Sequence, residues 1–180
     1  MIKKSIVSIL VLLGAILPMI GQVRPAALMS GAKATDIEFN DKSGKTVKLS
    51  SLYGKVLYID FWATWCGPCR QQIPYMEKLA EHYKNNKKVC FISISLDEDR
   101  DAWLKMIEKD KPQWAQYIAT PEQAQLISRA YGIRTIPRFI IINADGTINQ
   151  ANAMRPSDPD FITVFDKILK QQKKNINYEL

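Results

Sequence analysis

The chain has 180 residues, of which 47% are hydrophobic and 24% are charged, and its formal net charge is +7 at pH 7. This length and composition predict one domain with a sizeable hydrophobic core. The basic residues are scattered or form small lysine clusters, without the interleaved aromatic residues of a base-reading surface. We therefore expect no nucleic-acid partner.

The N-terminus has the pattern of a secretory signal peptide, which is predicted to cover residues 1–21. Lys3 and Lys4 precede a short apolar stretch over residues 6–20, as in a charged n-region followed by an h-region. The stretch is short for a membrane span and carries helix breakers near its end. This favours cleavage, with an N-terminal membrane anchor as the alternative, and either outcome predicts an extracytoplasmic protein, in the periplasm.

The rest of the chain divides into three further segments. We expect a flexible lead-in over residues 22–33, a folded domain over residues 34–172 and a tail over residues 173–180. Loss of the two lysines with the signal peptide lowers the formal net charge from +7 to +5.

The predicted domain begins with a hairpin and a buried strand. Residues 36–39 and 46–49 alternate polar and apolar side chains around a turn that contains Gly44, which is typical of a β-hairpin. Residues 56–61 form a nearly continuous apolar run, as expected of a strand that is covered on both faces of a sheet.

The most informative motif follows this strand, at the start of a predicted helix. It reads Trp65-Cys66-Gly67-Pro68-Cys69, and this spacing brings the two sulfurs within bonding reach. The first cysteine would lie at a helix N-terminus, where unpaired N–H groups favour its thiolate over its thiol. A thiolate is the nucleophile that attacks a disulfide of another protein, so the motif predicts a redox-active pair.

Zinc binding and a purely structural disulfide are the alternatives to a redox role for this cysteine pair. A zinc ribbon needs further Cys or His ligands, and the rest of the chain offers only Cys90 and His82. A bridge that closes so short a loop adds little stability. We therefore expect no metal ion and no other cofactor. Cys90 is expected to be a small buried hydrophobe on a strand, and His82 a solvated residue at a helix end.

The remaining elements follow from hydrophobic periodicity and from chain breakers. Their order predicts an α/β fold with a mixed central sheet flanked by helices. The predicted segments are a helix over residues 66–83 with a kink at Pro74, a strand over 89–96, a helix over 99–109, an irregular segment or short strand over 113–119, a helix over 122–131, a hairpin of 139–143 and 147–150, and a helix over 160–171.

Two segments of the chain together carry a family resemblance. Residues 59–69 resemble the active-site strand and motif of thioredoxin, and residues 131–137 resemble its cis-proline loop. The N-terminal hairpin and the Phe-Trp-Ala-Thr-Trp-Cys sequence of residues 61–66 are more similar to the TlpA/ResA branch of that superfamily. That branch carries a strand–helix insertion, which residues 97–121 can supply. The resemblance covers residues 34–169 and implies a thioredoxin fold and an extracytoplasmic thiol-disulfide oxidoreductase.

The resemblance also implies roles for individual residues. Cys66 would be the attacking cysteine and Cys69 the resolving one. Pro137 would be cis and would hold a client chain through the backbone of the preceding residue. The implied substrate-binding residues are Trp65, Gly67, Pro68, Ile136 and Pro137.

The chain departs from the family pattern at two places. Members like ResA often carry a glutamate three residues after the second cysteine, where this chain has Gln72, which cannot titrate. The thioredoxin-type acid is present as Asp60, and burial raises the pKa of a carboxyl group, so we expect Asp60 to accept the Cys69 proton near neutral pH. Residues 152–156 replace a glycine that lines the substrate groove of thioredoxin, which suggests a narrower set of clients.

The dipeptide between the cysteines bears on the direction of electron flow. Thioredoxin has the same Gly-Pro dipeptide and a reduction potential of about −270 mV. The oxidant DsbA has a reduction potential of about −120 mV, and sites like that of DsbA have a histidine in this dipeptide. The dipeptide favours a reductase of disulfide-bearing client proteins, with an oxidase or isomerase on the same scaffold as the alternative. By resemblance, the electron donor would be a membrane carrier of the CcdA/DsbD type, and we expect a monomer.

Two other classes fit the sequence less well. A peroxiredoxin-like peroxidase attacks peroxide with a cysteine in a Thr-x-x-Cys setting, and Thr64 is one residue too close to Cys66. A copper-binding module of the Sco type needs a more widely spaced cysteine pair and a downstream histidine. The single histidine of this chain lies in or just beyond the helix that the motif begins.

Overall fold

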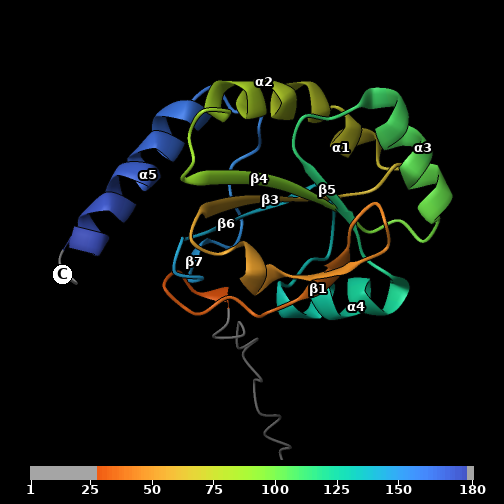
Figure 1. Ribbon diagram of the computed structural model, residues 1–180, viewed down its shortest axis with the longest axis horizontal. Coiled ribbons are helices and arrows are strands. Elements are labelled where there is room, and N and C mark those ends of the chain that lie inside the picture. Colours follow the sequence, from red (N-terminus) through yellow and green to blue (C-terminus); the bar gives the residue numbers. More distant parts are fainter. Residues whose placement is uncertain (1–27, 178–180) are drawn as a thin grey trace, which may run out of the picture.

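A seven-stranded mixed sheet forms the centre of the computed structural model, which describes residues 28–177. The strand order is β2-β1-β5-β4-β3-β6-β7, and helices cover both faces (Figure 1). The predicted α/β class with a mixed sheet is therefore confirmed. The predicted signal peptide, residues 1–21, lies outside the described residues. Within those residues, no helix combines the length and the apolar character needed to cross a bilayer.

The elements follow the predicted order closely. The strands are β1 (Glu38–Asn40), β2 (Thr46–Lys48), β3 (Val56–Trp62), β4 (Val89–Ser95), β5 (Ala115–Ile118), β6 (Arg138–Ile142) and β7 (Ile148–Gln150). The helices are α1 (Gly67–Arg70), α2 (Ile73–Tyr83), α3 (Arg100–Asp110), α4 (Pro121–Ala130) and α5 (Phe161–Asn177), with a short 3₁₀ helix at Leu49–Leu52.

Strand β3 lies inside the sheet, and all seven of its residues are buried. It pairs in parallel with β4 and antiparallel with β6. Successive side chains of a strand point to opposite faces, so Leu57, Ile59 and Phe61 join the core that includes Ile127 of α4. Tyr58 packs on the other face, with side chains of α2 and α5. The predicted burial of this strand on both faces is confirmed.

Residues 97–121, predicted to supply a strand–helix insertion between the redox motif and the cis-proline loop, form α3 followed by β5, so the helix comes before the strand. Asp99 caps α3, since its carboxylate accepts hydrogen bonds from the N–H groups of Asp101 and Ala102, both at 3.0 Å. The last helical residue is Asp110, and the C-cap Lys111, just before Pro112, has a left-handed φ of 48°. Strand β5 pairs in parallel with β4 and antiparallel with β1, so the insertion joins the hairpin to the central sheet.

The predicted long helix over residues 66–83 is wrong in one respect: it is two helices, α1 and α2, rather than one helix with a kink. Proline has no N–H to donate and clashes with the preceding turn of a helix, but it fits the first turn. Pro68 and Pro74 each occupy the first turn of their own helix. Pro74 therefore begins a new helix.

Helix α5 and the N-terminal backbone contacts both reach past the boundaries expected from the sequence. Helix α5 continues to Asn177, past the predicted helix end at residue 171. Within the expected lead-in, the N–H of Gly31 donates to the carbonyl of Ile148 at 2.8 Å, and the N–H of Ile148 donates to the carbonyl of Ala32 at 2.8 Å. Backbone contacts with β7 therefore begin ahead of residue 34.

Candidate active site

The cysteines of the motif form a disulfide at the start of α1. The Cα atoms of Cys66 and Cys69 are 5.2 Å apart. Cys66 is the N-cap of α1, and its Sγ accepts a hydrogen bond from the N–H of Cys69 at 3.2 Å. The first cysteine therefore lies where a helix presents unpaired N–H groups, and such groups stabilise negative charge. The pairing and the N-terminal position expected from the sequence are both present.

Exposure does not distinguish the two cysteines, because both are buried, Cys66 at 5% and Cys69 at 3% relative exposure. The residues between and before them form an exposed rim. Trp65 is 72% exposed, and Gly67 and Pro68 are exposed as well. The disulfide therefore lies next to an exposed rim formed by Trp65, Gly67 and Pro68.

The predicted proline loop lies beside the disulfide. The peptide bond between Ile136 and Pro137 is cis, as the resemblance implied. Ile136 is half-buried and packs against the cluster of buried side chains that contains Cys66 and Cys69. The structure thus brings together the two segments on which the family resemblance depends, although they are far apart in the sequence.

Asp60 is a buried carboxylate in the middle of β3. Burial raises its pKa from the ordinary 3.8 to about 7, and a hydrogen bond from Ser93 opposes that rise. The Oγ of Ser93 donates to Oδ2 at 3.0 Å, whereas Oδ1 is buried and makes no hydrogen bond within the described residues. The expected burial and raised pKa of Asp60 are confirmed.

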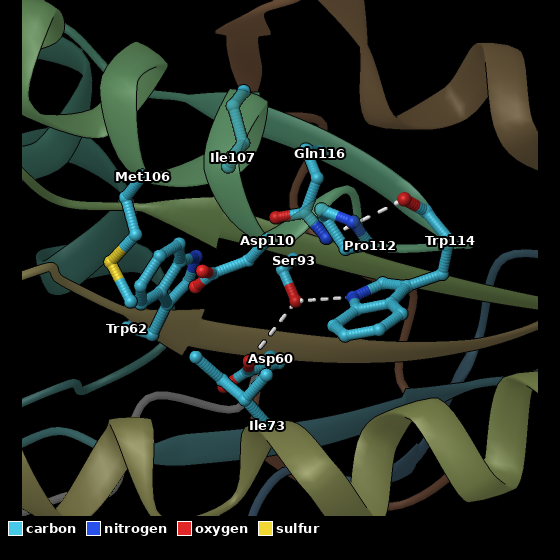
Figure 2. Close-up of a pocket in the computed structure, with 10 residues that line it drawn as sticks. All are labelled: Asp60, Trp62, Ile73, Ser93, Met106, Ile107, Asp110, Pro112, Trp114 and Gln116. Atoms are coloured by element: carbon cyan, nitrogen blue, oxygen red, sulfur yellow. Dashed lines mark hydrogen bonds between the residues drawn. The ribbon is translucent and has the colours of Figure 1, made fainter.

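A small cavity of about 20 Å³ adjoins Asp60 (Figure 2). Trp62, Ile73, Met106 and Ile107 form part of its wall. These side chains also pack in the cluster that contains the disulfide. A single layer of side chains therefore contacts both the cavity and the cysteine pair.

Sequence reasoning missed a second buried carboxylate, Asp97, which holds the segment just before the motif. Its carboxylate accepts hydrogen bonds from the N–H of Thr64 at 2.9 Å and from the Thr64 hydroxyl at 2.7 Å. The hydroxyl of Ser95 donates to it at 2.5 Å. A signal was available, because β3 and β4 are parallel strands and their carboxyl ends meet at one edge of the sheet.

Gln72, the departure from the ResA pattern, has a structural contact of its own. It is buried, and its Oε1 accepts a hydrogen bond from the N–H of Ser157 at 3.1 Å. The hydroxyl of Tyr58 donates to the carbonyl of Met154 at 2.7 Å in the same loop. The Tyr58 contact holds the loop of residues 152–156, which replaces the groove glycine of thioredoxin, against β3, and the Gln72 contact holds the residue just after that loop against the start of α2.

The remaining cysteine and the histidine lie away from the disulfide. Cys90 is a free, half-buried thiol on β4, and burial raises its pKa, which keeps it protonated and unreactive. His82 is exposed near the end of α2, as predicted. The described part of the chain holds no group of three or more Cys, His, Asp or Glu residues that could bind a metal ion.

The fold and the site together define a thioredoxin-like protein whose two motif cysteines form a disulfide at the start of a helix. The sequence profile of the Redoxin family matches residues 29–164, and the chain belongs to that family.

Known relatives agree with this assignment. The chain is 27% identical over 122 residues to the thiol-disulfide oxidoreductase ResA of Bacillus subtilis, covering 68% of this chain and 66% of the relative. It is 30% identical over 120 residues to ResA of Bacillus thuringiensis subsp. konkukian, covering 67% of each. The chain thus spans 66% of the length of the first relative and 67% of the length of the second, or about two thirds of each.

Solved structures give the same answer. One neighbour is a candidate thiol-disulfide oxidoreductase from Bacteroides vulgatus, with 37% identity, a TM-score of 0.72 and coverage of 79% of this chain and 98% of that one. Another is the thioredoxin domain of a thiol-disulfide oxidoreductase from the same organism, with 29% identity, a TM-score of 0.70 and coverage of 78% and 98%. The expected thioredoxin fold of the TlpA/ResA type is therefore confirmed.

Proposed function

We propose that the protein reduces disulfides of other proteins through its Cys66–Cys69 pair. The observation that carries this proposal is the pair itself: a disulfide at the N-terminus of a helix, beneath an exposed rim and beside a cis-proline loop. The ResA relatives and the structural neighbours are named for the same thiol–disulfide chemistry. The expected substrate class is therefore a disulfide-bearing client protein.

The reaction would proceed by two thiol–disulfide exchanges. In the first, the Cys66 thiolate attacks one sulfur of the client disulfide. The client S–S bond breaks, a mixed disulfide forms, and the other client sulfur leaves as a thiolate. In the second, the Cys69 thiolate attacks Cys66 and releases the remaining client sulfur. The client gains two electrons, and the cysteine pair is oxidised to its disulfide.

The site supports a different contribution to each step. For the first step, the N–H of Cys69 points at the Cys66 sulfur, and a hydrogen bond to a charged acceptor is stronger than one to a neutral acceptor. For the second step, Asp60 would take the proton of Cys69. Its pKa of about 7 suits a general base that works at neutral pH.

The client chain would bind across the rim and the proline loop. Trp65 offers a large exposed apolar surface, and Gly67 and Pro68 lie exposed beside it. The backbone of Ile136, before Pro137, would pair with an extended client segment. Extended segments commonly bind through main-chain hydrogen bonds of this kind.

The proposal includes a location and an electron donor. The two lysines and the apolar stretch near the N-terminus support export, and the protein would work as a monomer in the periplasm. A reductase in an oxidising compartment must be re-reduced, and a membrane carrier of the CcdA/DsbD type would do so. The alternatives use the same residues: an oxidase would run the exchange in the opposite direction, and an isomerase would break and re-form client disulfides without net electron transfer.

Trapping variants test the function directly. Cys69→Ser should accumulate mixed disulfides with clients through Cys66, because attack remains and resolution is lost, whereas Cys66→Ser should trap none. Wild-type protein should also reduce insulin disulfides when supplied with dithiothreitol. The proposal fails if Cys69→Ser traps no more protein than Cys66→Ser does.

A further inference from the structure

We propose that Ser93 and Trp114 are positioning residues that hold the carboxylate of Asp60 for proton transfer. They form a hydrogen-bond relay that ends on one oxygen of Asp60 and leaves the other oxygen to receive the proton of Cys69. The inference rests on the proposed function, since it concerns the resolving step, and it adds a role for the inserted segment of the chain.

The direction of the relay follows from the chemistry of its members. The indole N–H of Trp114 donates to the Oγ of Ser93 at 2.8 Å, and an indole nitrogen can only donate. The Ser93 oxygen is therefore an acceptor in this contact, and its single proton is directed to Oδ2 of Asp60, at 3.0 Å. Figure 2 shows the three side chains in a row. Oδ2 is thus occupied by a donor, and Oδ1 has no hydrogen-bond partner within the described residues.

The sheet register fixes these positions. Asp60 and Ser93 are paired residues of the parallel strands β3 and β4. Trp114 directly precedes β5, which pairs with the other edge of β4. The first donor of the relay, Trp114, therefore comes from the insertion of α3 and β5, so the insertion contributes to the surroundings of Asp60.

The surroundings of Asp60 favour Oδ1 as the proton acceptor. Asp60 and Trp62 both line the cavity of about 20 Å³, and the indole N–H of Trp62 is also buried without a partner. A volume of this size can hold about one water molecule. Exposed Asp110 lines the same cavity, so the cavity reaches the surface beside the end of α3. On this proposal, the cavity would give a proton on Oδ1 a route to solvent.

The groups that face Asp60 from each neighbouring element are few. Helix α3 contributes Asp110 and helix α2 the apolar Ile73. Strand β6 contributes the apolar Phe139, as the paired residue of Asp60. On β3 itself, the negative charge of Asp60 adds to the burial that raises the pKa of Tyr58. No lysine or arginine lines the cavity, so the relay is the main contact that favours the ionised carboxylate.

In the resolving step, the S–H bond of Cys69 breaks and an O–H bond forms at Oδ1. The electron pair left on the sulfur attacks Cys66, and the client sulfur leaves with the electrons of the mixed disulfide. A hydrogen bond donated to a carboxylate favours its ionised form. Loss of the relay should therefore raise the pH that the resolving step requires.

The pH dependence of the resolving step can be measured by stopped-flow mixing of reduced protein with an aromatic disulfide, such as Ellman's reagent. The first aromatic thiol is released by attack and the second by resolution, in a Cys90→Ser background so that only the pair reports. Ser93→Ala should move the midpoint of the resolving phase upward by about one pH unit, which slows it about fivefold at pH 7. The attack phase should be unchanged. Ser93→Thr retains the hydroxyl and should restore the wild-type profile.

Tryptophan variants provide a matched comparison. Trp114→Phe removes the donor that orients Ser93 and should shift the midpoint in the same direction by a smaller amount. Trp103→Phe removes an indole N–H that is buried and has no partner, so it should leave the midpoint unchanged. Thermal unfolding of each variant separates a loss of stability from a change in the profile.

Asp60→Asn distinguishes failure of the relay from failure of the proposed base. If Asp60→Asn slows resolution but Ser93→Ala leaves the midpoint in place, the relay is refuted and the base stands. If Ser93→Ala shifts the midpoint equally in the Asp60→Asn background, Ser93 does not act through Asp60 and the relay is also refuted. If Asp60→Asn itself has no effect, both are refuted, and the thiol–disulfide function is judged by the attack phase.

Discussion

Asp60 is the residue at which function and stability conflict most clearly. Its carboxylate is buried, and burial favours the protonated form over the ionised one. A leucine or valine would pack into this strand without such a cost. The proposed proton transfer between Asp60 and the Cys69 thiol gives an acid at this position a use, since an apolar side chain cannot accept a proton.

We predict that Asp60→Asn stabilises the oxidised protein in a pH-dependent manner. The folded-state pKa of about 7 lies above the ordinary value of 3.8, so the folded state holds more protons than the unfolded state between these values. The stability of the wild type therefore falls as pH rises through this window. Because asparagine does not titrate, the gain should be absent below pH 4 and should reach at most about 4 kcal/mol above pH 7.

Denaturant unfolding of the oxidised protein at several pH values measures this gain. Asp110→Asn is the matched control, because Asp110 lines the same cavity but is exposed, and it should show no comparable dependence. A gain for Asp60→Asn that is constant from pH 4 to pH 8 would contradict the argument.

At the scale of elements, the active-site cysteine depends on contacts on both sides of it. Helix α1 has only four residues and supplies the N–H that reaches Cys66. The preceding segment is held by Asp97, from the end of β4, through two groups of Thr64. The short helix thus depends on a neighbouring strand for its position.

We predict that Asp97→Ala lowers the free energy of unfolding by about 2–4 kcal/mol, because it leaves the part-buried donors of Thr64 and the buried hydroxyl of Ser95 without their acceptor. It should also slow the attack by Cys66, since the segment before the cysteine loses its anchor. Stopped-flow release of the first aromatic thiol measures that attack, and urea unfolding measures the stability.

Asp99→Ala provides the comparison for this variant. Asp99 lies two positions further on and caps α3, so its loss should cost about 1 kcal/mol and leave the attack rate unchanged. Equal attack rates for Asp97→Ala and wild type would show that the hydrogen bonds between Thr64 and Asp97 serve stability alone.

At the scale of the whole molecule, the disulfide lies where the hairpin-bearing sheet, the insertion and the proline loop meet. Its cluster combines Trp62 from β3, Trp103 from α3 and Ile118 from β5, with Ile136 packed against it. The site is therefore supported by elements from across the domain, while its rim remains open to a client.

We predict that the reduction potential of the pair lies nearer to about −270 mV, the value for thioredoxin, than to about −120 mV, the value for DsbA. DsbA is oxidising because its reduced form is stabilised. The Gly67-Pro68 dipeptide contains no histidine that could stabilise the Cys66 thiolate in the reduced form, so the reduced form lacks the stabilisation that makes DsbA an oxidant.

Equilibration with glutathione or dithiothreitol buffers, followed by thiol counting, gives this potential. A value above about −180 mV, that of protein disulfide isomerase, would favour the oxidase or isomerase alternative. Substitution of Pro68 by histidine should raise the potential, because an imidazolium beside Cys66 stabilises its thiolate.

The sequence alone determined the features that depend on local spacing. Two residues between cysteines, Pro68 in the first turn and the apolar run before them specify a cysteine pair at a helix start after a buried strand, and the structure has this arrangement. The cis-proline loop was predicted from the resemblance of residues 131–137 to thioredoxin, and the Ile136–Pro137 bond is cis. The burial of Asp60 was predictable because it lies inside an apolar run that is covered on both faces.

Tertiary structure alone decided which groups meet Asp60 and the motif. Ser93 is 33 residues from Asp60, Asp97 is 33 residues from Thr64, and Trp114 is 21 residues from Ser93. These contacts depend on the register between parallel strands, and a shift of one residue would turn each side chain to the opposite face. Register is set by packing of the whole sheet against its helices. No local pattern in the sequence therefore specifies the hydrogen-bond relay to Asp60 or the hydrogen bonds between Asp97 and Thr64.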